Sequence, residues 1–275
     1  MSMVRSGQGN AWLPEDYGKV LSLAVEAKSV AAQTSTVVRT NRESIGFPLW
    51  VSDPTVAFYN ELDEISLSDG DTDEVVIVPK KTAGLVLASS ELLDDSDPSI
   101  ADSIGHGLAN QLAKAVDVAW AANTTTKAYN GLLSKATTTV DSGVATLANL
   151  DAFVSARFAA EAHGAHLTHW VLDPAVAETL SNLKVASGSN QPLLQFVEDG
   201  ITIAGLPVIT TTDVDANTQA FGIDKTQQRL VIRQGATVEK FPSVTNDGWY
   251  LRGIMRVGWD TLNPAGIVRI WNATP

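Results

Sequence analysis

The chain has 275 residues, of which 44% are hydrophobic and 18% charged, and its formal net charge is −12 at pH 7. Binding to a phosphate backbone needs clustered Lys and Arg, so this acidic balance argues against a protein that binds nucleic acid through a basic stripe. The absence of cysteine excludes disulfides, thiolate nucleophiles and zinc–cysteine sites. No apolar run approaches the roughly 18 residues of a membrane span. We therefore expect a globular chain with a substantial core and no membrane partner.

The N-terminal part of the chain is irregular in composition. Apolar spacing over residues 19–28 predicts one short helix, and the Thr/Ser/Val stretch from Gln33 to Thr40 predicts extended chain because β-branched residues disfavour helix. Two interpretations of this stretch stay open. It is either an arm that lies on another molecule or a first strand of the fold.

A long acidic hairpin is predicted between Phe47 and Val78. Two extended segments flank the polar residues 66–73, where Asp69-Gly70 is a hairpin-turn signal. The return strand stops at Pro79, which cannot donate to a β-ladder. Such a projecting ribbon has little core of its own, so we expect a partner to order it.

A long helix is the clearest predicted element. Asp97 and Pro98 form an N-cap and first-turn pair. Gly105 and Gly107 fall inside this helix, and we expect any bend to concentrate there. One apolar stripe then repeats every four residues as far as the helix end near Asn123: Ile100, Ile104, Leu108, Leu112 and Val116.

Mixed α+β structure is predicted for the rest of the chain. A second helix ends at Gly164, and Asp173-Pro174 begins a third. The apolar residues assigned to one face of the second helix are Leu147, Leu150, Phe153, Val154 and Phe158. The segments assigned to strands are 167–172, 201–204, 207–211, 229–233, 236–241, 249–259 and 266–271.

No catalytic, cofactor or metal site emerges from the motifs. Residues 105–110 imitate a dinucleotide fingerprint, but they lack the third glycine and lie inside the long helix. His163, His166 and His169 form the only histidine cluster, and Gly164 separates them onto different elements. The acidic run 69–74 lacks the glycine and glutamate positions of a calcium loop. We expect no enzyme activity and no cofactor.

The segment Ser90-Glu91-Leu92-Leu93-Asp94-Asp95-Ser96 resembles the entry to the spine helix in major capsid proteins of tailed bacteriophages, which have the Hong Kong 97-type fold. Further stretches resemble that family's landmarks in the same order. They are Trp12-Leu13-Pro14, Glu61–Ile65 as the outgoing strand of the ribbon called the E-loop, Val78–Lys81 as its return, Asn130–Leu133, Trp170–Pro174, Ala204–Val208 and Asn263–Val268.

The resemblance implies an α+β capsid fold with an N-terminal arm, an E-loop, a peripheral domain that holds the long spine helix, and an axial domain. The implied boundaries are 1–44 for the arm, 45–84 for the E-loop, 85–132 with 226–260 for the peripheral domain, and 133–225 with 261–275 for the axial domain.

The resemblance also implies a function and a set of partners. Copies of the chain would form the hexamers and pentamers of an icosahedral head in the virion, made in the host cytoplasm, around double-stranded DNA that is not bound sequence-specifically. A portal would be a further partner, and a separate scaffold or decoration protein stays open. The sequence begins at the arm, so we expect any scaffold to be a separate protein or absent.

Cohesion of the shell is expected to be non-covalent. Some family members weld their shells through an E-loop lysine, whereas no lysine lies between Phe47 and Pro79 here. An acidic ribbon tip must then meet cations of a neighbour. The residues predicted to form these intersubunit contacts are Asp69, Asp71, Asp73, Arg229, Arg252 and Arg256.

Two alternatives stay open at this point. A bacterial encapsulin shares the fold but encloses enzymes, so a bound cargo peptide in place of packaged DNA would identify it. A soluble α+β hydrolase that uses residues 163–169 is the alternative from another class, and a monomer with measurable turnover would favour it.

Overall fold

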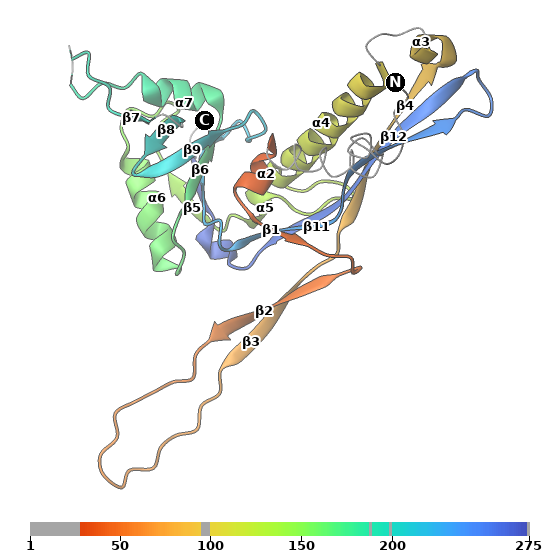
Figure 1. Ribbon diagram of the computed structural model, residues 1–275. Helices are drawn as coiled ribbons and strands as arrows, with labels where there is room; N and C mark the ends of the chain where they lie inside the picture. The colour runs from red at the N-terminus through yellow and green to blue at the C-terminus, as the bar shows by residue number, and fades with distance from the viewer. Residues whose placement is uncertain (1–27, 95–99, 187–188, 198–199, 274–275) are drawn as a thin grey trace, which may run out of the picture.

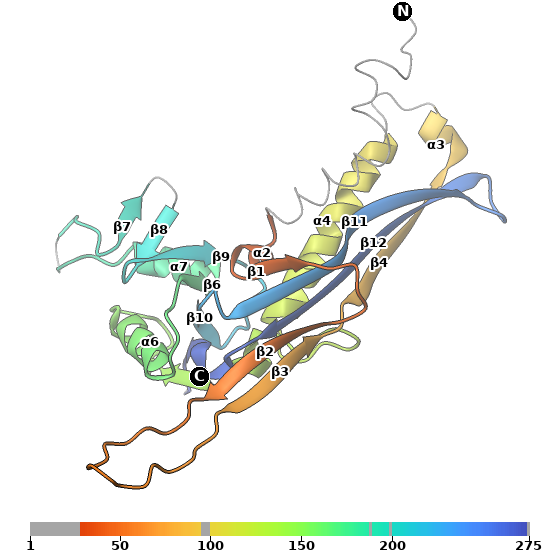
Figure 2. The same ribbon diagram turned by 60° about the horizontal axis from the view of Figure 1, so that its bottom comes forward.

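Two β-sheets carry most of the folded chain, and a two-stranded ribbon projects from them (Figures 1 and 2). The structure is a computed structural model that describes residues 28–94, 100–186, 189–197 and 200–273. The predicted helix over 19–28 falls almost wholly outside this range, as do Asp97 and Pro98.

The first sheet has four strands in the order β1-β11-β12-β4. Its centre is a long antiparallel hairpin, in which a register shift after Ile232 accounts for the gap between two predicted strands. The stretch after Gln33 pairs in parallel with β11, so it is a strand of the chain's own sheet and not a free arm. The strands are β1 (Thr36–Arg39), β4 (Lys80–Ser89), β11 (Gln228–Pro242) and β12 (Gly248–Thr261).

Helix α4 (Ile100–Ala121) packs along one face of this sheet, after the short helix α3 (Ser90–Asp94). Leu108 and Leu112 approach the sheet closely at Gly84 and Gly253, where a Cβ would lie 3.2 Å from a leucine methyl carbon. The predicted long helix is confirmed, and the part of its stripe from Leu108 to Val116 is buried.

The second sheet has seven strands in the order β5-β13-β10-β6-β9-β8-β7. One inner strand, β10, was not predicted, because a strand covered on both faces shows no apolar–polar alternation, and all six of its residues are buried. The strands are β5 (Thr138–Asp141), β6 (His169–Leu172), β7 (Gln195–Val197), β8 (Gly200–Ile203), β9 (Leu206–Thr210), β10 (Thr218–Ile223) and β13 (Val268–Trp271).

Two helices belong to the second sheet, α6 (Asp151–Ala162) and α7 (Pro174–Ser181). Asp173 caps α7 through a 2.8 Å hydrogen bond from the Ala175 amide, as predicted. Gly164, with φ of +72°, follows the end of α6.

The apolar face predicted for α6 is partly wrong. Phe153 is fully buried, with its ring edge-on to Trp170 at a centroid distance of 5.0 Å. Val154 and Phe158, however, are 45% and 64% exposed. The buried stripe continues instead through Ala156 and Ala160, whose small side chains carry too weak an apolar signal to define the face.

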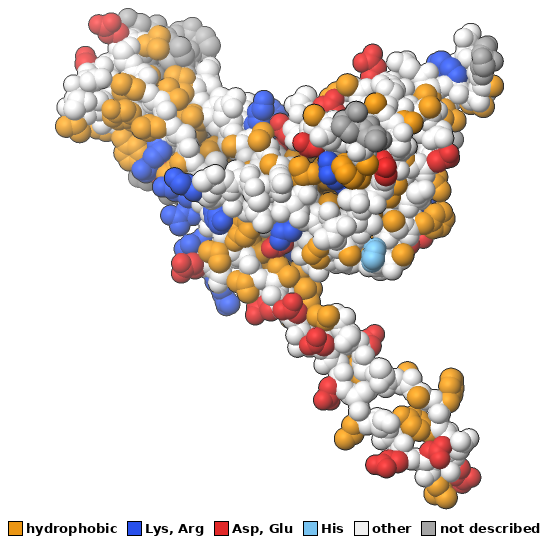
Figure 3. Space-filling view, turned by 180° about the vertical axis from the view of Figure 1, so that it is seen from behind, with side chains coloured by type: hydrophobic (Ala, Val, Ile, Leu, Met, Phe, Trp, Pro, Cys, Tyr) orange, Lys and Arg blue, Asp and Glu red, His pale blue; other side chains and the backbone are white. Residues whose placement is uncertain are grey.

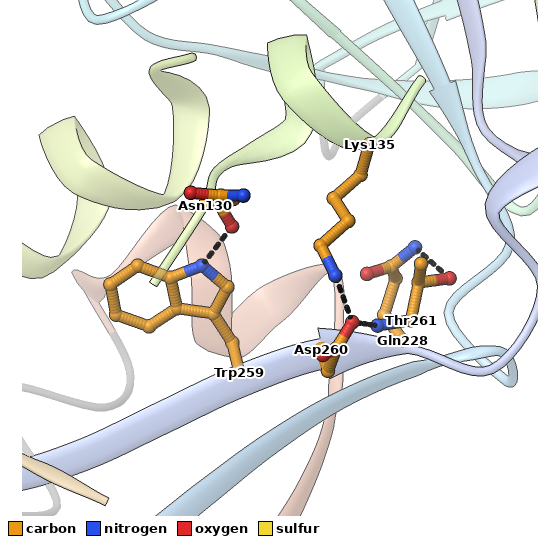
Figure 4. Close-up of polar contacts among 6 residues, drawn as sticks. All are labelled: Asn130, Lys135, Gln228, Trp259, Asp260 and Thr261. Atoms are coloured by element: carbon orange, nitrogen blue, oxygen red, sulfur yellow. Dashed lines mark hydrogen bonds and ion pairs between the residues drawn. The ribbon is translucent and has the colours of Figure 1, made fainter. Parts of the chain in front are cut away.

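Polar contacts hold the segment that leads from the first sheet to the second against β12 (Figure 4). Lys135, on the short helix α5 (Leu132–Lys135), pairs with Asp260 at 2.7 Å. The Trp259 indole donates to the Asn130 carbonyl at 3.0 Å. Val171 and Phe221 of the second sheet share one hydrophobic cluster with α4. The crossing continues through the 3₁₀ turn η2 (Pro264–Gly266) into β13.

Helix α2 (Val30–Gln33) is tied to the C-terminal part of α4 by one buried carboxylate. Asp117 accepts hydrogen bonds from the Ser29 hydroxyl at 2.6 Å and from the amides of Ala31 at 3.0 Å and Val30 at 3.1 Å. Burial raises the pKa of Asp117, the three donors oppose this shift, and the nearby charge of Asp213 adds to it. These hydrogen bonds hold the segment that precedes β1 against α4.

Candidate assembly interface

The predicted ribbon is present and projects away from both sheets (Figure 1). Strand β2 (Ile45–Ser52) pairs antiparallel with β3 (Asp71–Ile77). The predicted turn at Asp69-Gly70 is wrong, because the last pair is Ser52 with Asp71 and a loop over 53–70 closes the ribbon. A Cβ on Gly70 would lie 2.5 Å from the Trp50 ring, so Gly70 permits close packing at the loop's base.

The far end of the loop is a turn at Glu61-Leu62, and the prediction of an outgoing strand over 61–65 is wrong. The Asn60 amide donates to the Asp63 carboxylate at 2.8 Å, and the Asp63 amide donates back to the Asn60 carbonyl at 3.2 Å. These paired bonds stabilise a turn where strand pairing was expected. The two sides of the loop are also linked, since the Ser68 hydroxyl donates to the Thr55 carbonyl at 3.0 Å.

The loop exposes large apolar side chains to an extent that no other segment matches within the described chain. Phe58, Leu62 and Leu67 are completely exposed, and Val56 is 95% exposed. Burying such a side chain is worth about 1.5–3 kcal/mol, and this gain is not realised in the single subunit. A cluster of exposed apolar residues is typical of a surface that binds a partner.

The three predicted contact carboxylates lie together where the loop joins β3. Asp69, Asp71 and Asp73 are all exposed, and none forms an ion pair with another described residue. Figure 3 shows acidic side chains along the whole ribbon, with hydrophobic ones between them near its end. Asp69, Asp71 and Asp73 therefore lie at the base of the loop, whereas the sequence predicted them at its tip.

The three predicted arginines lie on the four-stranded sheet and differ in their surroundings. Arg252 pairs with Glu239 at 2.6 Å and stacks over Phe241, so its charge is already partnered within the subunit. Arg229 donates to the Thr226 carbonyl at 2.5 Å.

Arg256 differs from both, because its buried Nε lacks a hydrogen-bond partner among the described residues. It lies opposite Lys81 on β4, a cation that the sequence prediction missed. Arg256 and Lys81 are on the sheet face opposite α4, since the buried residues Leu251, Met255 and Val257 alternate with them. Figure 3 shows basic side chains gathered on this part of the molecule.

The structure does not bring the histidines into one site. His163 and His166 are exposed, whereas His169 is half-buried and its Nδ1 lies 2.8 Å from the Thr168 hydroxyl. Burial lowers the pKa of His169, and the charge of Lys225 contributes in the same direction. Among the described residues, no group of three or more His, Asp or Glu is placed to hold a metal ion. Residues 105–110 lie within α4, away from its N-terminus.

None of the helices in the described part of the chain is long and apolar enough to span a membrane. Three features of the described chain are candidates for binding a partner. They are the exposed apolar loop of the ribbon, the ribbon carboxylates Asp69, Asp71 and Asp73, and the basic face of the four-stranded sheet.

Comparison with known proteins places these features in a family. The family model described as the phage capsid family matches residues 9–271. A solved chain from Mycobacterium phage Adephagia has a TM-score of 0.76 and 15% identity, and the match covers 100% of this chain and 99% of that chain. One from Mycobacterium phage Bobi has a TM-score of 0.75 and 17% identity, with coverage of 90% and 91%.

A structure titled as the capsid of an empty GTA particle has a TM-score of 0.73 and 21% identity, with 90% of each chain covered. No curated protein gives a significant match. These findings favour neither an encapsulin nor a hydrolase. The chain belongs to the phage capsid family, has the Hong Kong 97-type fold, and is a subunit that assembles into an icosahedral viral shell.

Proposed function

We propose that this chain is the major capsid protein of a phage head, assembled as hexamers and pentamers around double-stranded DNA. The observation that carries the proposal is the ribbon loop, whose apolar side chains are exposed in one subunit and need a second copy to bury them. The net charge of −12 supports a container that does not adhere to the DNA it encloses.

The proposed domain division follows the path of the chain between the two sheets. The chain crosses from the first sheet to the second after α5, returns between β10 and β11, and crosses again between β12 and β13. We assign 1–44 to the arm, 45–84 to the E-loop, 85–132 and 226–260 to the peripheral domain, and 133–225 and 261–275 to the axial domain.

The ribbon of one subunit would lie across the four-stranded sheet of the next. Its carboxylates at Asp69, Asp71 and Asp73 would meet cations there, of which Arg256 and Lys81 are free of carboxylate partners among the described residues. Arg252 and Arg229 would contribute less, because each already has a partner within its own subunit. An exposed pair is worth about 0–1 kcal/mol, but a shell repeats the contact at every subunit.

Cohesion of this shell would be non-covalent. The chain has no cysteine and no lysine between Phe47 and Pro79, so neither a disulfide nor a ribbon isopeptide bond has a donor there. A portal, a separate scaffold and a decoration protein remain proposed partners, and the host cytoplasm remains the proposed site of synthesis.

Electron microscopy and sedimentation of the purified chain test the proposal. We expect shells, rings or tubes for the wild type, and for Phe58→Tyr as the conservative control. Phe58→Asp should leave subunits that fold but assemble poorly, since a carboxylate replaces an apolar contact. Monomers at every concentration, or full assembly of Phe58→Asp, would contradict the proposed role of the loop.

A further inference from the structure

A cavity of about 220 Å³ lies between the second half of α4, the start of β4 and the loop that follows α4. Its floor is apolar and includes Val116, Ala119 and Trp259. Cavities of about 150 Å³ with apolar walls hold a benzene-sized group. The cavity therefore has room for one branched or aromatic side chain.

Three lysines line the rim of this cavity, and no carboxylate lines it. The Lys80 ammonium donates to the Ala128 carbonyl at 2.9 Å and lies 4.7 Å from the centre of the Tyr129 ring. Lys81 and Lys127 are exposed and have no ion-pair partner in the described part of the chain. An apolar floor with a cationic rim fits an apolar side chain that is flanked by carboxylates.

The tip of the ribbon presents such a group. Leu62 is completely exposed and has φ of +73°, a conformation uncommon for a non-glycine residue. Glu61, Asp63 and Glu64 flank it, and all three are exposed. The paired hydrogen bonds between Asn60 and Asp63 hold the turn in shape before any partner arrives, which lowers the entropic cost of binding.

We infer that the lysine-rimmed cavity receives Leu62 from a second copy of the chain, with the flanking carboxylates on the lysine rim. This inference rests on the proposed function and names the receiving site of the ribbon tip. The chain's own loop does not supply the occupant, because the ribbon projects away from the body (Figure 1).

Lys81 connects this cavity to the basic face of the sheet at the edge strand β4. It is the register partner of Arg256, which lies on the face opposite α4, and it also lines the cavity on the α4 side, so the two basic regions meet at this edge. The stretch from Asp71 to Leu62 can span about 30 Å at roughly 3.3 Å per residue. A ribbon that passes over the edge formed by β4 can therefore place Asp69, Asp71 and Asp73 at the sheet face and its tip in the cavity.

Carbodiimide cross-linking of wild-type particles tests the inference, because it joins only carboxylates and amines in direct contact. We expect linked peptides that join Glu61, Asp63 or Glu64 to Lys80, Lys81 or Lys127 in particles and not in unassembled subunits. Intact particles whose tip carboxylates link to other lysines, or to none, would overturn the inference and leave the proposed function standing. Failure of the wild type to form particles would overturn both.

Charge reversal gives a second test on folded subunits, since both residues changed are exposed. Lys127→Glu should raise the concentration needed for half-assembly by about tenfold, equivalent to about 1.4 kcal/mol. Lys127→Glu combined with Glu61→Lys should restore most of that loss, whereas Lys127→Glu with Glu178→Lys on α7 should not. Equal assembly of both double variants, or no loss in Lys127→Glu, would contradict the inference.

Discussion

The seven-stranded sheet and the ribbon use hydrophobic residues in opposite ways. In the sheet, Trp170 is fully buried against Phe153, and its indole donates to the Ile203 carbonyl at 3.0 Å. In the ribbon loop, Phe58 and Leu62 are completely exposed. The sheet therefore buries its large apolar side chains within one chain, whereas the loop leaves its apolar side chains to be covered by another.

Two free energies must therefore be distinguished: the free energy of unfolding of the single subunit and the free energy of assembly of the shell. Stability of the subunit resides in the two sheets and α4, whose two hydrophobic clusters are buried without a neighbour. Cohesion of the shell resides in segments that add little to subunit stability. Substitutions in the two regions should accordingly affect different measurements.

The largest contrast is expected between Trp170→Ala and Phe58→Ala. Trp170→Ala should lower the free energy of unfolding by about 3–5 kcal/mol, because it removes a fully buried ring. Phe58→Ala should change it by less than about 0.5 kcal/mol but impair assembly. Urea unfolding of unassembled subunits and sedimentation of particles measure the two effects. Similar losses of subunit stability in both variants would remove the contrast.

A smaller loss in the free energy of unfolding of the subunit is expected for Gly131→Ala. A Cβ at Gly131 would lie 2.2 Å from the Ala122 carbonyl oxygen and 2.6 Å from that of Trp120, so the end of α4 would have to shift. Overpacking of this kind costs about 1–3 kcal/mol.

Gly107→Ala is the matched control within the same region. A Cβ there meets nothing within 4 Å, and alanine favours helix over glycine by about 1 kcal/mol. Thermal unfolding should therefore show opposite shifts for the two variants, and shifts of the same sign would contradict the account. That any bend in α4 concentrates at Gly105 and Gly107 stays a prediction.

Removing charge from the ribbon should act on assembly alone. Changing Asp69, Asp71 and Asp73 to Asn should weaken particles and reduce the salt dependence of their assembly, at about 0–1 kcal/mol for each contact. Glu178→Gln on α7 serves as a charge control. Light scattering against salt concentration measures the effect, and an unchanged salt dependence in the triple variant would exclude these carboxylates as a source of cohesion.

The smallest expected effect concerns pH and the anchor of α2. Because the pKa of Asp117 is raised above its ordinary 3.8 in the folded subunit, the native state binds this proton more tightly than the unfolded chain. The contribution of Asp117 to the free energy of unfolding therefore falls as pH rises from 3.8 through the raised pKa. Asp117→Asn removes this dependence.

Unfolding of both proteins across that pH range measures the effect. The stability of the wild type relative to Asp117→Asn should decrease as pH rises and then level off. A relative stability that increases with pH would show that the three hydrogen bonds to the carboxylate outweigh its burial.

Local signals in the sequence were enough to predict several elements. The cap at Asp173 and the stop at Gly164 depend only on neighbouring backbone, and the stripe from Leu108 to Val116 depends on one face of α4. The landmark glycine Gly131 likewise has a local reason, since no side chain fits against the end of α4. Such features depend on nearby residues, so they can be predicted from the sequence without knowledge of the fold.

The errors arose where distant segments decide the structure. Strand β10 is buried on both faces by elements far away in sequence, so its pattern carries no period. The ribbon turn was placed at Asp69-Gly70 because that dipeptide is a turn signal, but Gly70 packs against Trp50 and the strands separate there.

The same limit applies to the predicted contact residues. Arg252 was grouped with Arg256, yet only the structure shows that Glu239 already partners Arg252. Lys127 carried no sequence signal and became a candidate only through the cavity that it lines. Lys81 belongs to the Val78–Lys81 landmark, but only the structure shows that it lies opposite Arg256 and lines the same cavity.

Hydrogen exchange of the ribbon in unassembled subunits and in particles tests the central claim most directly. We predict that the amides of residues 53–70 exchange rapidly in the subunit and become protected in particles, while those of α4 from Leu108 to Val116 are protected in both. Equal exchange of 53–70 in the two states, with intact particles, would contradict the claim that a neighbouring copy covers the ribbon.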